Sequence, residues 1–135
     1  GTLERFAEDY WRHEAAYRVR MRLLGESHAD TLMAREAFGL SCLTCGNPVA
    51  AMAHLSAVLD AAVAVSGPES GDSLRRLFNL GQATASAGDL AKAEELLALA
   101  LMRHARSLGP QHELTGTVAE ELSILRDSVS GGGHA

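Results

Sequence analysis

Aromatic residues are scarce in this chain: they make up 4% of its 135 residues, although 47% of the residues are hydrophobic. The apolar content is therefore mostly Ala and Leu, which favour helices over strands. The sequence predicts an all-α protein. Its length suits one domain that buries about two thirds of its unfolded surface.

An excess of positive charge is also lacking, since the formal net charge is −5 and the pI is about 5.6. A chain that binds polyanions by general electrostatic attraction needs basic residues that displace counterions. The arginines within residues 12–22 are offset by nearby carboxylates, which favours a solvated helix face; these carboxylates are Glu4, Glu8, Asp9 and Glu14. We therefore expect no nucleic-acid partner.

A long, uninterrupted apolar run is missing as well. The longest candidate, residues 49–65, is shorter than a typical membrane span and contains His54, Ser56 and Asp60, which are costly in hydrocarbon. It is predicted to be a core helix, with no membrane partner. The first residues show no secretory signal pattern, and two cysteines cannot form a disulfide framework. A cytoplasmic location is the expectation.

What the sequence does contain is an internal period. Gly25, Gly67 and Gly109 recur at intervals of 42 residues. Such self-similarity is typical of repeat architectures, in which each unit buries its apolar face against the next. The same offset pairs further identical residues: Asp30 with Asp72, Leu32 with Leu74, Gly39 with Gly81, Gly46 with Gly88, Ala51 with Ala93, Leu55 with Leu97, and Leu59 with Leu101.

Each period is predicted to form two antiparallel helices joined by a short turn. In the second copy, apolar residues recur at three- and four-residue spacing from Leu74 onward, which indicates one face of a helix. Gly88 is expected to end that helix in a left-handed turn, and Asp89 to cap the next helix.

Glycine also occurs inside the predicted helices, at Gly39 and Gly81. It costs about 1 kcal/mol relative to alanine in a helix. We therefore expect a neighbouring helix to approach closely at both positions, with Ala51 and Ala93 facing the contact.

The pair Cys42 and Cys45 resembles a redox or metal motif, but one period later the same positions hold Thr84 and Ala87. The slot therefore needs a small residue and no sulfur. A redox pair is activated at a helix N-terminus, whereas this one falls in a last helical turn, before Gly46. A zinc site would need two further ligands. We expect packed, unreactive thiols; a weak metal or redox role is the alternative.

The second copy resembles the tetratricopeptide repeat family. The resemblance is carried by "LFNLGQA" (77–83), the Gly-Asp turn at 88–89, and then Ala93, Leu97 and Ala100. The small residues fit the family pattern, while its aromatic positions are replaced. The 42-residue period with the "LGPQH" connector (108–112) is similar to the subclass typified by kinesin light chains.

The resemblance implies an α-solenoid of about six helices within a single domain at residues 1–129. Residues 3–24 fit the second helix of a preceding repeat, 29–66 and 71–108 two full repeats, and 113–128 the leading helix of a following repeat or a cap. Arg35 departs from the pattern, because it stands at a large apolar position. Residues 130–135 are expected to be a disordered tail.

In this family the first helix of each pair lines the concave side of the stack, which implies a groove for a peptide or partner segment. Asn79 is the leading candidate, since its amide can both donate to and accept from an extended backbone. Arg75 is expected to pair with a carboxylate, and apolar side chains to add contact area. The predicted binding residues are Met33, Glu36, Leu40, Arg75, Phe78, Asn79, Gln82 and Glu120, and the same faces also carry Ala37, Thr117, Glu121 and Ile124.

Catalysis finds little support in the sequence. There is no phosphate-binding glycine loop, and the six histidines are dispersed. His28 and His112 are expected to act as caps or turn residues in connectors, and His104 to face outward. We expect no cofactor, no metal and no enzyme activity.

Two functions remain open. One is a protein interaction module within a larger bacterial regulatory or scaffolding protein. The alternative is a structural domain that packs against a neighbouring domain or forms homo-oligomers through its exposed end helices.

Overall fold

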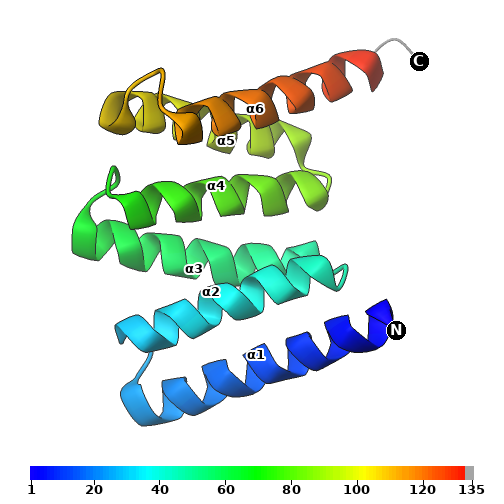
Figure 1. Ribbon diagram of the computed structural model, residues 1–135, viewed down its shortest axis with the longest axis vertical. Helices are drawn as coiled ribbons and strands as arrows, with labels where there is room; N and C mark the ends of the chain where they lie inside the picture. The colour runs from blue at the N-terminus through cyan, green and yellow to red at the C-terminus, as the bar shows by residue number, and fades with distance from the viewer. Residues whose placement is uncertain (133–135) are drawn as a thin grey trace.

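The structure, a computed structural model, describes residues 1–132, and these form six α-helices with no strand. The helices are α1 (Thr2–Leu24), α2 (Ala29–Thr44), α3 (Pro48–Ser66), α4 (Gly71–Ser86), α5 (Leu90–Leu108) and α6 (Glu113–Gly132). They run back and forth, each packed on the next along the longest axis, with the N-terminus near one end of the stack and the C-terminus near the other (Figure 1). The predictions of an all-α chain and of six helices are confirmed.

The two central helix pairs match each other closely. α2 and α4 each have 16 residues, and α3 and α5 each have 19. Their buried positions also recur at the 42-residue offset: Ala51 with Ala93, Leu55 with Leu97, Val58 with Ala100, and Ala62 with His104. The sequence period is therefore also a period of burial.

Side-chain caps begin these helices where the sequence places them. Asn47 accepts a hydrogen bond from the amide of Ala50, and Asp89 accepts one from the amide of Lys92. Gly46 and Gly88, which precede them, have φ angles of 85° and 90°, a region that L side chains rarely adopt. The predicted turns and caps are confirmed.

The histidines of the connectors also act as caps. The Nδ1 atom of His28 accepts a hydrogen bond from the amide of Asp30, and Nδ1 of His112 accepts one from the amide of Leu114. Ser70, at the equivalent position between them, caps α4 through the amide of Ser73. A side-chain N-cap therefore begins each of the helices α2, α4 and α6.

Both helical glycines lie at a close helix approach, as predicted, but the contact residues differ. A Cβ built on Gly81 would lie 2.7 Å from Leu97 Cδ2, and one on Gly39 would lie 3.2 Å from Leu55 Cδ2. At Gly39 the Cβ of His54 is equally near, at 3.2 Å, so the nearest atoms belong to the leucines and to His54 and not to Ala93 and Ala51. A leucine reaches into the slot that the missing side chain leaves.

Two further expectations are wrong. His104 is buried at 4% exposure, with its Nδ1 atom 2.6 Å from the carbonyl oxygen of Ala100, although its arginine neighbours suggested an outward position. The predicted disordered tail at 130–135 is wrong for 130–132, which continue α6, while 133–135 lie outside the described residues.

α3 is the only helix of residues 1–132 that is long and apolar enough to cross a membrane. In the structure it lies between α2 and α4, and its buried residues are Ala51, Leu55, Val58 and Ala62. A core helix meets the same criterion of length and composition, so the absence of a membrane partner stays a prediction.

Candidate functional site

The predicted groove residues belong to three helices, α2, α4 and α6. The interval between α2 and α4 differs from the interval between α4 and α6. Between α2 and α4 the groove is closed by ion pairs. Glu36 is only 9% exposed; its Oε2 accepts a hydrogen bond from Arg76 Nε at 2.9 Å, and its Oε1 accepts one from Arg75 Nη2 at 3.1 Å. Because Arg76 is also buried, this contact ties the two helices together and leaves Glu36 no free oxygen for a ligand.

Between α4 and α6 the same face is open, and two cavities follow one another along the helices. The first has a volume of about 350 Å³, and the second of about 340 Å³. The first is lined by Gly71, Leu74, Arg75, Phe78, His104, Leu108, Leu114, Thr117 and Val118. The second is lined by Gln82, Ala85, Ser86, Leu90, Leu97, Glu121, Ile124, Leu125 and Ser128. We call these two cavities together the α4–α6 groove.

Three of the eight predicted binding residues line the α4–α6 groove. Arg75 and Phe78 face its first cavity, and Gln82 faces the second. Thr117, Glu121 and Ile124, which the sequence placed on the same faces, line it from α6.

The structure does not bring the other five residues together. Glu36 is held in its ion pairs, and Met33 lines a separate cavity of about 240 Å³ between α1 and α2. Leu40 and Glu120 are exposed; Asn79, the leading candidate, is half-buried and lines neither cavity of the groove.

Sequence reasoning missed the contribution of the second helix of the pair. His104 and Leu108 of α5 contribute to the first cavity, and Leu90 and Leu97 to the second. The pattern of first-helix faces could not indicate them, because residues of α5 reach the groove only where α4 and α6 separate. Leu114 and Val118 of α6 carried a signal, since both lie on the apolar stripe of residues 113–128.

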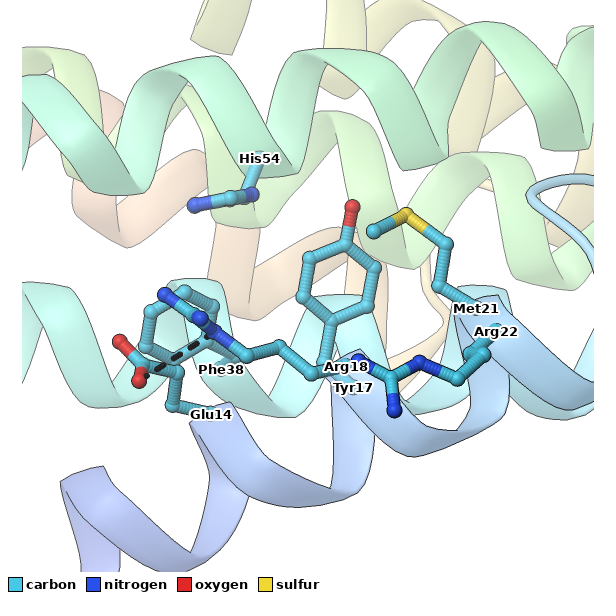
Figure 2. Close-up of a pocket in the computed structure, with 7 residues that line it drawn as sticks. All are labelled: Glu14, Tyr17, Arg18, Met21, Arg22, Phe38 and His54. Carbon is cyan, nitrogen blue, oxygen red and sulfur yellow. Dashed lines mark ion pairs between the residues drawn. The ribbon is translucent and has the colours of Figure 1, made fainter.

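A further cavity lies at the other end of the molecule, between α1 and α3 with α2 beneath it, and has a volume of about 500 Å³. We call it the α1–α3 pocket (Figure 2). It is lined by Glu14, Tyr17, Arg18, Met21, Arg22, Phe38 and His54. No sequence prediction pointed to this place, although five of the six aromatic residues fall within residues 6–38.

The rings of the α1–α3 pocket contact one another. Tyr17 stacks on Phe38 at a centroid distance of 6.1 Å, and His54 lies 4.9 Å from Phe38 and 5.8 Å from Tyr17. Arg35 donates from Nε to His54 Nδ1 at 3.2 Å, and its guanidinium lies 5.6 Å from the centre of the Tyr17 ring. Burial, and then the charge of Arg35, lower the pKa of His54, so this ring is neutral at pH 7.

The cysteines differ in their surroundings. Cys42 is buried at 1% exposure, and burial raises the pKa of its thiol, followed by the effects of Cys45 and Glu14. Cys45 is exposed at the end of α2, so the expectation of packing holds for Cys42 and is wrong for Cys45. Within residues 1–132, no three His, Cys, Asp or Glu side chains are grouped so as to hold a metal ion.

In comparisons with known proteins, no family model matches the chain, and no curated protein matches it.

Proposed function

We propose that this chain is a non-catalytic protein interaction module of tetratricopeptide repeat type, which binds an extended peptide segment in the α4–α6 groove. The observation that carries the proposal is the succession of two cavities, about 350 and 340 Å³, along one pair of helices. They lie where the predicted binding residues Arg75, Phe78 and Gln82 meet α6. We propose the open α4–α6 interval, and not the closed α2–α4 interval, as the binding surface.

The dimensions of the groove suit a short peptide. Its lining residues on α4 extend from Gly71 to Ser86. At about 1.5 Å per helical residue this span is roughly 22 Å, which an extended segment of about six or seven residues covers at about 3.3 Å each.

The two ends of the groove differ in chemistry, which gives a bound peptide a direction. Around Phe78 the lining is mostly apolar, with Arg75 beside it, so this end suits an apolar anchor side chain next to a carboxylate. Arg75 is 53% exposed and contacts Glu36 and Asp72, so a ligand carboxylate would share it with these groups. Gln82 and Glu121 at the other end offer partners to backbone amides.

The test uses the full chain and a library of random seven-residue peptides displayed on phage, followed by titration of the enriched peptide in solution. We expect Leu114→Arg to weaken binding by at least about tenfold, because it places a charge at an apolar cavity. Leu114 is 53% exposed, so the variant should fold. Val65→Arg, at an 82% exposed position on α3, is the matched control.

Failure to enrich a peptide sequence, or peptides that bind the Leu114→Arg variant as tightly as the parent chain, would contradict the proposal. Equal loss in the Val65→Arg control would also count against it, because the added charge alone would then explain the effect.

The structural alternative rests on a different observation, the exposed apolar side chains of α1. Trp11 is 62% exposed, Val19 54% and Leu23 74%. If the chain associates with itself through this end helix, its molar mass by light scattering should be that of a dimer and should fall to that of a monomer in a Trp11→Glu variant.

A further inference from the structure

The two repeats provide an internal control for the α1–α3 pocket. One period after Tyr17, Phe38 and His54, the chain has Leu59, Leu80 and Leu96. Those leucines belong to one apolar cluster of the core, which Phe38 and Tyr17 join from the first repeat. Where the second interval has a packed aliphatic contact, the first has an open cavity of about 500 Å³ walled by rings.

At a fourth position, too, the first repeat has a different kind of side chain where the second has a leucine. Arg35 stands where the second repeat has Leu77, a core residue with 1% exposure. Replacing a buried leucine by arginine is costly unless the guanidinium finds partners. Arg35 finds them in His54, in the Tyr17 ring and, at 3.9 Å, in Glu26. The polar and aromatic substitutions of the first repeat therefore converge on one place.

The hydrogen bond from Arg35 decides which nitrogen of His54 carries the proton. A guanidinium has donors only, so Nδ1 of His54 must be the acceptor and must lack a proton. Since the ring is neutral, its proton is on Nε2, which is left as a donor. This donor belongs to a residue that lines the pocket.

The charged groups of the pocket are mostly cationic. Arg18 and Arg22 line it from α1, against one carboxylate, Glu14, which lies 3.4 Å from Arg18 (Figure 2). Arg22 makes no ion pair with any of residues 1–132. A guanidinium that has no ion-pair partner among the described residues, and that lies beside an array of rings, suits a ligand with a negative charge and a flat apolar body.

We propose that the α1–α3 pocket binds a small aromatic carboxylate, with the carboxylate on Arg22 and the ring system against Tyr17, Phe38 and His54. A volume of about 500 Å³ is in the range of small-molecule sites. The site is independent of the α4–α6 groove, so the chain would bind a peptide at one end and a small organic anion at the other.

The test is a nuclear magnetic resonance titration of the full chain with naphthalene-2-carboxylate, compared with the uncharged naphthalene-2-carboxamide. We expect the carboxylate to shift resonances of Tyr17, Phe38 and His54 and to bind about tenfold more tightly than the carboxamide. Arg22→Gln should remove that difference. Arg12→Gln, the same change at an exposed position on the same helix, should preserve it.

A second variant places the residues of the second repeat in the first: Tyr17→Leu, Phe38→Leu and His54→Leu together should remove the rings that the ligand contacts and abolish carboxylate binding. If the carboxamide binds as tightly as the carboxylate, the proposal is wrong. It is equally wrong if Arg22→Gln changes nothing, or if the shifted resonances belong to the α4–α6 groove. The Arg22 comparison decides the matter even if the triple variant does not fold, because Arg22 is exposed.

Discussion

The first helix pair, α2 and α3, and the second, α4 and α5, share a period, helix lengths and capping positions, yet they are built with different side chains. The second repeat packs Leu77, Leu80 and Leu96 where the first has Arg35, Phe38 and His54. The same backbone plan therefore gives an aliphatic contact in one interval and an open, partly charged pocket in the other. Repeats of this kind separate what the fold requires from what an individual site requires.

The largest effect on stability is expected from exchanging the residues at positions 35 and 77, which are equivalent in the two repeats. Leu77→Arg should cost about 4 kcal/mol or more, because position 77 is fully buried among apolar residues and offers no partner for the charge. Against a typical total stability of about 5 to 15 kcal/mol, this substitution should unfold much of the protein.

The reciprocal change, Arg35→Leu, should alter stability by less than about 1 kcal/mol, since the leucine removes the desolvation cost of a partly buried charge and this offsets the contacts that are lost. Urea unfolding followed by circular dichroism measures both. Similar losses in the two variants would break the comparison, because the two positions would then have equivalent environments.

A smaller difference is expected between the helical glycines. Gly81→Ala puts a Cβ 2.7 Å from Leu97 Cδ2, and Leu97 is buried at 2% exposure, so the overpacking should exceed the helix-propensity gain of about 1 kcal/mol. Gly39→Ala meets its nearest atoms at 3.2 Å and should be close to neutral. We expect a difference of about 1 to 2 kcal/mol in thermal unfolding between the two variants. Equal melting temperatures would show that the two slots are equally tight.

The smallest effect concerns pH and is confined to the first repeat. Burial lowers the pKa of His54 below its ordinary value of 6.5, so protons bind the unfolded chain more readily than the folded one. His54 therefore does not reduce the free energy of unfolding above pH 6.5, and it reduces it increasingly as the pH falls below that value. The charged and titratable groups that face His54 are Arg35 from α2 and Glu14, Tyr17, Arg18 and Arg22 from α1.

Replacing His54 by the residue of the second repeat isolates its share of the pH dependence. The His54→Leu variant should lose less stability than the parent chain between pH 6.5 and pH 5, in urea titrations at each pH. If the stability of the two chains depends on pH in the same way, His54 is not the group whose protonation destabilises the folded state.

The sequence predicted the α4–α6 groove in part and the α1–α3 pocket not at all. Arg75, Phe78 and Gln82 were found because they share the face of one helix, a property that a spacing of three and four residues reveals. Asn79 was favoured for the chemistry of its amide, but it lies outside the cavities. Glu36 was placed among ligand-binding residues although it forms the buried contact to Arg76, 40 positions away in the chain.

The sequence by itself determined the six helices, their caps at Asn47 and Asp89, and the period that repeats them, because each depends on residues a few positions apart and on a regular apolar spacing. Only the tertiary structure decided which grooves are open. Glu36 closes one interval by reaching across from α2 to α4, whereas α4 and α6 leave two cavities between them. Such contacts join helices that are not neighbours in the chain, and the reach of a long side chain across that gap is not a property of any local pattern.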